Sequence, residues 1–213
     1  MRARAGLGLL VITAGAAAYA KAWRPWQLRW GATDEEVARS LPGDEMVPTT
    51  TFNATRAISI GAPPERVWPW LVQVGTKRAG WYSYDLLDNL GHRSARRIIP
   101  ELQVLAAGDV VPMSPDGKQG INVCSLDPPH SMVWGTPGDT SWVWQLDTQP
   151  DGTTRLITRI RSRIRWTPMS IAFSGLIELG DFWMIRKMLH GLRERAEGGK
   201  EMVPRFGCSR VRR

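Results

Sequence analysis

The densest group of side chains that could do chemistry is the stretch GWYSYD, residues 80–85. Aromatic rings, hydroxyl groups and a carboxylate this close together are typical of an apolar pocket mouth that also hydrogen-bonds its ligand. Asp85 and Tyr84 could move a proton or polarise a carbonyl group there, and Trp81 and Tyr82 could line a binding site. A purely structural interpretation stays open: the rings would fill the core, and Asp85 would favour the N-terminus of a short helix.

Asp181 is the second candidate, because it interrupts the apolar face of a predicted long helix. At about 100° per residue it projects between Ile177 and Met188, toward the predicted sheet. A carboxylate on such a face costs several kcal/mol unless it is paired. We therefore expect it either to find a Trp, Tyr or Arg97 donor, or to contact a ligand or act as an acid or base.

The third group is the aromatic set, in which 11 Trp stand against 3 Tyr and 4 Phe. Large rigid rings suit either a ligand cavity or a membrane boundary. Trp142 and Trp144 share one strand face, and we expect both to point inward rather than to stack outward on arginines. The residues predicted to line a ligand site are Trp70, Trp81, Tyr82, Tyr84, Trp134, Trp142, Trp144, Asp181 and Trp183.

Other chemistry is excluded by missing motifs. The sequence has no GxGxxG or Walker A loop, no HExxH, no paired CxxC and no GxSxG elbow, and its 3 His are scattered. We therefore predict no metal site and no cofactor. The 2 Cys are too few for a disulfide framework.

The net charge is +8 and the pI is about 10.2, which permits attraction to anionic lipid or nucleic acid. No DNA- or RNA-binding motif accompanies the charge, so we predict no nucleic-acid partner. Arg159, Arg161, Arg163 and Arg165 alternate along one face of a predicted strand, here called the arginine row, and we expect this row to meet water. The oligomeric state does not follow from the sequence.

The N-terminus has the anatomy of an anchoring or export segment. Residues 5–20 are free of charge and are followed by Lys21 and Trp23, whereas a bilayer span needs about 20 apolar residues. Interleaved Trp and basic residues suit the headgroup zone and favour a retained single-pass anchor. A cleaved signal peptide, which would leave the protein secreted, and a buried N-terminal helix are the alternatives. Basic residues flank both ends, so the side of the membrane stays open.

Patterns along the rest of the chain predict an α+β fold. A strand begins near Ala54, a helix with prolines at its start follows, and a long helix covers about 169–197. Between them, short alternating runs separated by turn residues indicate an antiparallel meander. A bent sheet cannot lie flush along a straight helix, so we expect a cavity between them. The predicted divisions are an anchor or signal at 1–23, a juxtamembrane segment and linker at 24–53, the folded domain at 54–197 and a basic tail at 198–213.

The strings APPERVWPWLVQVG, RAGWYSYDLLDNLG and ELGDFWMIRKML, in this element order, resemble the SRPBCC superfamily. These are START-like helix-grip proteins, often described as polyketide cyclase/dehydrase-like, and the strings are similar to a bacterial membrane-tethered subgroup. The resemblance covers about residues 54–197. It implies a cavity for a hydrophobic ligand between the sheet and the C-terminal helix, but no particular reaction, because the superfamily holds binders, transfer proteins, cyclases and hydrolase regulators.

Three hypotheses follow. The first is a membrane-tethered module that binds a hydrophobic or amphipathic small molecule of lipid or polyketide type. The second is a cyclase- or dehydratase-type enzyme in which Asp181 or Asp85 moves protons and Tyr84 or Tyr82 polarises a carbonyl group. The third is an envelope structural protein whose arginine row binds anionic lipid or a partner.

Overall fold

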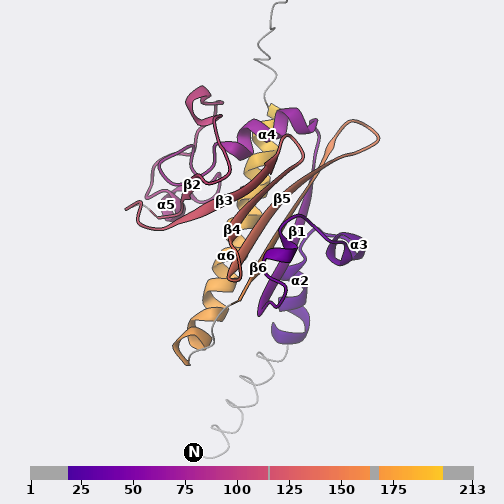
Figure 1. The fold of residues 1–213 in the computed structure, drawn as a ribbon, viewed down its shortest axis with the longest axis vertical. Helices are drawn as coiled ribbons and strands as arrows, with labels where there is room; N and C mark the ends of the chain where they lie inside the picture. Colours follow the sequence, from indigo (N-terminus) through magenta and orange to yellow (C-terminus); the bar gives the residue numbers. More distant parts are fainter. Residues whose placement is uncertain (1–18, 115, 164–167, 199–213) are drawn as a thin grey trace, which may run out of the picture.

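One antiparallel sheet and one long helix make up most of the fold (Figure 1). The computed structural model of the chain describes residues 19–114, 116–163 and 168–198. The strand order in the sheet is β1-β6-β5-β4-β3-β2. The strands are β1 (Phe52–Ile60), β2 (Val110–Pro112), β3 (Gly120–Asp127), β4 (Ser131–Thr136), β5 (Thr140–Thr148) and β6 (Thr154–Ser162). The predicted antiparallel meander is confirmed.

The helices lie mainly at the two ends of the sequence. They are η1 (Tyr19–Trp23), α2 (Arg24–Leu28), α3 (Asp34–Ala38), η2 (Asp44–Met46), α4 (Pro64–Val72), α5 (Asp85–Asp88), η3 (Pro100–Leu102) and α6 (Pro168–Gly198). Pro64 starts α4 in the way the sequence predicted, because a first-turn proline has no N–H that would need a partner. Asp85 is the first residue of α5, where the structural interpretation of the sequence placed a short helix.

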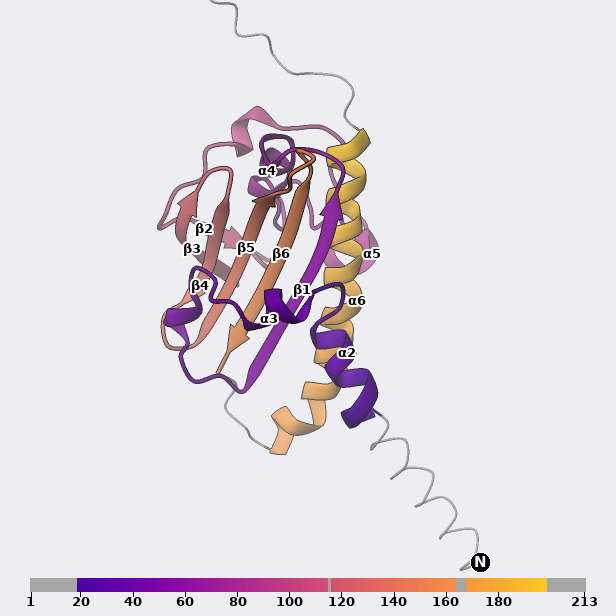
Figure 2. The ribbon, with the colours of Figure 1, turned by 90° about the vertical axis from the view of Figure 1, so that its right-hand side faces the viewer.

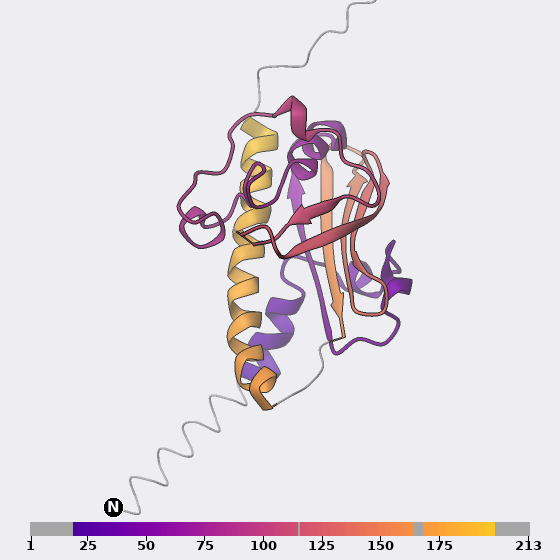
Figure 3. The ribbon, with the colours of Figure 1, turned by 60° about the vertical axis from the view of Figure 1, so that its left-hand side comes forward.

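Helix α6 packs across the inner, concave face of the sheet (Figure 3). Its buried residues follow the spacing of a single helical stripe: Phe182, Ile185, Met188, Leu189, Leu192 and Ala196. Met184 and Gly180 lie off this stripe, and both are exposed. A position two residues from Phe182 is rotated by about 200° around the axis, so it must face away when Phe182 faces in.

The outer face of the sheet is covered by residues 30–48 (Figure 2). Thr33 and Glu36 form a reciprocal capping box that starts α3. Leu41 then packs on Ala57, Val133, Val143 and Ile157, which form a second, smaller core. Residues 30–48 lie within the predicted juxtamembrane segment and linker at 24–53, and they pack on the sheet face that was expected to meet water.

Two members of the arginine row, Arg159 and Arg161, face this cover, which corrects the expectation that they meet water. Arg159 is buried and donates to Asp44 Oδ2 at 2.5 Å. Arg161 donates to the carbonyl oxygen of Val47 at 3.2 Å. Arg163 is exposed, and Arg165 lies outside the described residues. The Asp44 carboxylate and carbonyl groups of the covering segment therefore bind Arg159 and Arg161, two of the four arginines that the third hypothesis invokes.

The predicted anchor lies mostly at residues 1–18, outside the described residues, as does nearly all of the basic tail. In the part of the chain that the structure describes, no helix combines the length and the apolar character needed to cross a bilayer.

Candidate functional site

Tryptophans pack ring against ring on the inner face of the sheet. Trp134 on β4 lies 5.3 Å from Trp142 on β5, and Trp142 lies 4.9 Å from Trp144, between ring centroids. Trp81, from the loop between α4 and α5, stacks on Trp142 at 6.2 Å with the planes 7° apart. We call these four residues the tryptophan cluster. Trp142 and Trp144 both point inward, as predicted.

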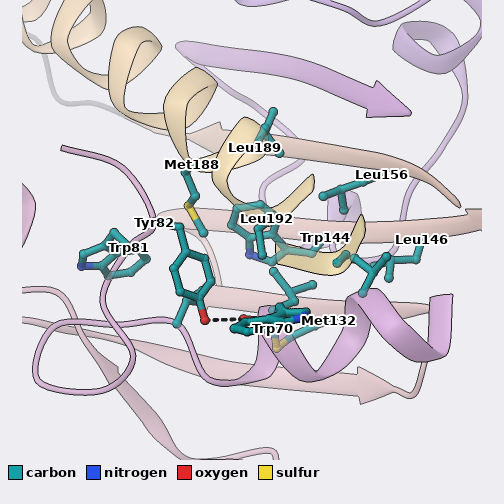
Figure 4. Packing of buried hydrophobic residues seen from close by; sticks show 14 of the residues in the cluster. Trp70, Trp81, Tyr82, Met132, Trp144, Leu146, Leu156, Met188, Leu189 and Leu192 are labelled. Atoms are coloured by element: carbon teal, nitrogen blue, oxygen red, sulfur yellow. Dashed lines mark hydrogen bonds between the residues drawn. The ribbon is translucent and has the colours of Figure 1, made fainter. Parts of the chain in front are cut away.

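Trp70 and Tyr82 extend this buried group at the side of α4 (Figure 4). Their rings meet edge to face at 6.2 Å. The Tyr82 hydroxyl donates to the Trp70 carbonyl oxygen at 3.0 Å and accepts from Gln73 Nε2 at 2.8 Å. Burial raises the pKa of Tyr82 above its ordinary value. The hydroxyl is thus neutral and fully used within the core, which makes Tyr82 a structural residue.

Side chains fill the space between the sheet and α6 in which we had expected a cavity. Met132, Met188 and Leu192 pack there together with the indole rings. Two pockets lie elsewhere: one of about 150 Å³ beside the loop 76–93, and one of about 450 Å³ between the N-terminal segment and β6. Neither is lined by a tryptophan. The sheet does curve away from the helix, but wide indoles span the gap.

Two indole N–H groups of the tryptophan cluster have no hydrogen-bond partner. Trp142 Nε1 donates to Thr158 Oγ1 at 2.8 Å, and Trp81 Nε1 donates to Thr76 Oγ1 at 2.9 Å. Trp134 Nε1 and Trp144 Nε1 are fully buried and donate to nothing. An unmade hydrogen bond of this kind costs about 1–3 kcal/mol, and buried polar groups in native proteins are nearly always paired. These two donors are buried polar atoms of the tryptophan cluster whose hydrogen bonds are not made within the described residues.

Asp181 faces the sheet, as predicted, and its partner is Arg56 on β1. Arg56 is only 1% exposed. Its Nη1 donates to Asp181 Oδ2 at 2.8 Å and its Nε donates to the Gln27 carbonyl oxygen at 3.1 Å, while its Nη2 is buried without a partner. Neither Arg97 nor an aromatic donor pairs with Asp181. The carboxylate therefore compensates a buried cation.

The polar contacts continue from Arg56 along α2 and α6. Glu178 Oε1 accepts from Gln27 Nε2 at 2.6 Å, and Glu178 Oε2 accepts from Arg24 Nε at 3.2 Å. Our sequence reasoning missed Arg56 as a site residue, although the signal was present. Arg56 alternates with apolar Ala54 and Ile58 on the inner face of β1, and a cation there requires an anion opposite.

Tyr84, Trp183 and Asp85 lie outside the tryptophan cluster. Tyr84 and Trp183 are each 41% exposed, the latter because its neighbour Phe182 takes the inward position on α6. Asp85 Oδ1 accepts from Ser94 Oγ at 2.6 Å. Among the described residues, no hydrogen bond or ion pair joins Asp85, Asp181 and the tyrosines to one another.

Comparison with known proteins rests on shape. No family model matches the sequence, and no curated protein is significantly similar to it. Similar solved structures include a protein from Bacillus halodurans (15% identity, TM-score 0.46, 70% of this chain and 99% of that one). A second is a polyketide-cyclase-like protein from Corynebacterium glutamicum (14% identity, TM-score 0.42, 73% of this chain and 99% of that one). A third is the Aha1 dimer from Colwellia psychrerythraea (17% identity, TM-score 0.41, 71% of this chain and 100% of that one).

The arrangement of the elements decides the fold. A β-strand and two short helices precede an antiparallel meander, and the C-terminal helix α6 lies in the concave face of the curved sheet. The chain has a helix-grip arrangement, with a six-stranded antiparallel sheet curved around the C-terminal helix. Its six-stranded sheet and C-terminal helix match what the sequence strings implied, and the tryptophan cluster lies between them.

Asp85 and Asp88 lie in the loop 76–93 around helix α5, here called the α5 loop. Their carboxylates predict opposite effects of pH on the stability of this helix-grip domain. Burial raises the pKa of Asp88, whose Oδ1 is unpaired. For Asp85, partial burial works against ionisation, but hydrogen bonds from Ser94 and Asn89 outweigh it and lower the pKa. The folded state therefore favours protonated Asp88 and ionised Asp85.

We expect Asp88→Asn to raise the free energy of unfolding at pH 7 by up to about 1 kcal/mol, and Asp85→Asn to lower it by about 1–2 kcal/mol. The gain in stability from Asp88→Asn should vanish at pH values below the ordinary pKa of Asp. Wild-type Asp88 lowers the free energy of unfolding only as the pH rises through the higher pKa that this group has in the folded state. The stabilisation by wild-type Asp85 is present at pH values above the ordinary pKa of Asp. It is lost as the pH falls through the lower pKa that Asp85 has in the folded state. Urea unfolding from pH 3 to pH 8 measures both, and changes of the same sign at pH 7 would contradict the assignment.

Proposed function

We propose that this helix-grip domain binds an apolar or amphipathic small molecule, of lipid or polyketide type, at the tryptophan cluster, and that residues 1–23 tether it to a membrane. The observation that carries the proposal is the pair of fully buried, unpaired donors Trp134 Nε1 and Trp144 Nε1. A ligand with an apolar body and an oxygen acceptor supplies the missing partner. Such a ligand also suits the surrounding rings, which offer large apolar contact area.

Access to the cluster runs through Trp81. This indole lies over Trp142 and comes from a loop whose ends, Gly75 and Gly80, are joined by two backbone hydrogen bonds of 3.2 and 3.1 Å. Both glycines have positive φ values, 133° and 80°, which only glycine adopts without strain. We propose that the loop opens, that Trp81 leaves its stacked position, and that an apolar group of the ligand takes its place.

The test begins with native mass spectrometry of the purified full chain, which shows the mass of any co-purified small molecule. Isothermal titration calorimetry then compares that compound, or fatty acids and their methyl ketones, with hydrocarbons of equal length. We expect the oxygenated members to bind more tightly, and Trp134→Phe/Trp144→Phe to abolish the preference with a loss of about 3- to 10-fold per donor.

Trp142→Phe is the matched control. It removes an indole N–H from the same cluster, but one that already donates to Thr158. We expect it to lower stability while it keeps the preference for an oxygen acceptor. Two results would contradict the proposed site. One is that Trp142→Phe loses the preference for oxygenated ligands while Trp134→Phe/Trp144→Phe keeps it. The other is that the wild type binds oxygenated ligands and hydrocarbons equally.

A further inference from the structure

The smaller pocket lies on the surface beside the α5 loop and is lined by cations. Its volume is about 150 Å³, and its wall includes Lys77, Arg78, Arg93 and His92. No acidic residue lines it. At roughly 30 Å³ per water, this volume suits one compact anion rather than a nucleotide. We call it the basic pocket.

The donors of the basic pocket are only partly used by the protein. Arg78 Nη2 donates to the carbonyl oxygens of Val72 and Leu102 at 3.2 and 3.3 Å, which fixes the guanidinium in place. Arg78 Nε is buried without a partner. The hydroxyl of Thr76 accepts from Trp81 Nε1, which leaves its own proton free to donate. Arg78 thus places a fixed guanidinium in the wall of the pocket, and guanidinium groups bind phosphate oxygens well.

The backbone around the basic pocket is strained. Lys77 and Leu90, both in its wall, have φ values of 61° and 50°. A left-handed conformation is unfavourable for residues other than glycine, and such strain gathers at ligand-binding segments. The surrounding fold thus holds the backbone of Lys77 and Leu90 in an otherwise unfavourable conformation in the wall of the basic pocket.

An apolar surface adjoins the basic pocket. Leu86, Leu87 and Leu90 are 78%, 69% and 64% exposed, on or next to the four-residue helix α5. Ser83 Oγ donates to the Met184 carbonyl oxygen at 3.0 Å, and this contact holds the loop against α6 near exposed Trp183. Exposed leucines next to cationic side chains are typical of protein surfaces that insert into the interface of a lipid bilayer.

We infer that the basic pocket binds the phosphate of an anionic phospholipid headgroup while the leucines of the α5 loop enter the adjoining acyl region. The occupant is a lipid surface because the pocket supplies charge complementarity and the neighbouring leucines supply apolar contact, which a free phosphate ion would not use. None of the four tryptophans of the cluster lines the basic pocket, and the two meet at Thr76, which accepts a hydrogen bond from Trp81.

The experiment uses the full chain in a vesicle sedimentation assay. Vesicles of phosphatidylcholine alone are compared with vesicles in which one fifth of the lipid is phosphatidylglycerol. Lys77→Gln/Arg93→Gln removes two exposed charges of the pocket. Arg29→Gln/Arg163→Gln removes two exposed charges outside its lining and leaves the same net charge. The N-terminal segment is common to all variants, so differences among them report on the pocket.

We expect Lys77→Gln/Arg93→Gln to weaken binding to the anionic vesicles by about thirtyfold, because each of the two charges contributes roughly fivefold. Arg29→Gln/Arg163→Gln should weaken this binding by less than about fivefold. Leu86→Ser/Leu87→Ser should weaken binding to both kinds of vesicle. A separate arm titrates inorganic phosphate and follows thermal unfolding.

Equal vesicle binding by the pocket and control variants would overturn the inference. It would also be overturned if inorganic phosphate stabilised the wild type while the leucine variant bound vesicles normally, because the pocket would then be a site for a free anion. Far-UV circular dichroism confirms that each variant is folded.

Discussion

Arg159→Met is expected to lower the free energy of unfolding by about 3–5 kcal/mol, the cost of leaving a buried ion pair without one partner. Arg159 makes five hydrogen bonds. Its acceptors are Thr55 Oγ1, Asp44 Oδ2 and the carbonyl oxygens of Glu36, Val37 and Arg39. Methionine fills much of the same volume but donates to none of them. The carbonyl groups lose this donor, and among the described residues Asp44 keeps only the Leu41 N–H at 3.0 Å and Arg161 at 3.8 Å.

The loss should be concentrated in the N-terminal cover. We expect amide hydrogen exchange to accelerate through residues 33–48 while β4 and β5 stay protected, because four of the five acceptors belong to that segment. Chemical denaturation gives the total effect. Arg163→Met, at an exposed arginine of the same row, is the control and should change stability by no more than about 0.5 kcal/mol.

A double variant separates the cause from simple loss of packing. If the unpaired charge of Asp44 dominates, Arg159→Met/Asp44→Asn should be more stable than the sum of the two single changes predicts. Strict additivity would contradict the buried ion pair as the source of the effect.

Gly191→Ala is expected to destabilise the protein by more than about 3 kcal/mol, although alanine favours helices over glycine by about 1 kcal/mol. A Cβ at this position of α6 would lie 2.2 Å from the Tyr82 carbonyl oxygen and 2.8 Å from Tyr82 Cβ. Neither the helix nor the loop can relieve this contact by a rotamer change, because the nearest atom belongs to the backbone. The overlap therefore outweighs the gain in helix propensity.

Gly180→Ala provides the matched control in the same helix. A Cβ there meets nothing within 4 Å, and Gly180 is exposed, so we expect a gain of up to about 1 kcal/mol. Thermal unfolding measures both variants. Tryptophan fluorescence should also change in Gly191→Ala, because Tyr82 is next to Trp81 in the chain and a shift of the loop alters the stack on Trp142. A neutral Gly191→Ala would mean that α6 and the loop do not touch as described.

Much of the candidate site could be predicted from the sequence, because inward positions repeat every second residue along a strand. That rule places Trp142 and Trp144 on one face, and it places Arg56 on the same face as Ile58. It does not show that Arg56 is the partner of Asp181, because the two are 125 positions apart and a pattern along one strand carries no information about the helix packed against it. The phase of α6 escaped prediction for a similar reason: apolar residues surround much of the helix, so Trp183 and Phe182 look equally suited to face inward.

By itself, the sequence determined the order of helices and strands, the antiparallel meander and the inward face of β5, because these follow from local periodicity and from the turn chemistry of Gly and Pro. Tertiary structure decided the rest. It brought residues 30–48 over the outer face and turned Arg159 and Arg161 toward a carboxylate and carbonyl groups of that segment. It also filled the expected cavity with indoles and left two of their N–H groups unpaired. Each of these outcomes depends on which distant groups meet, and the stability of a buried charge or donor is set by its partner rather than by its neighbours in the chain.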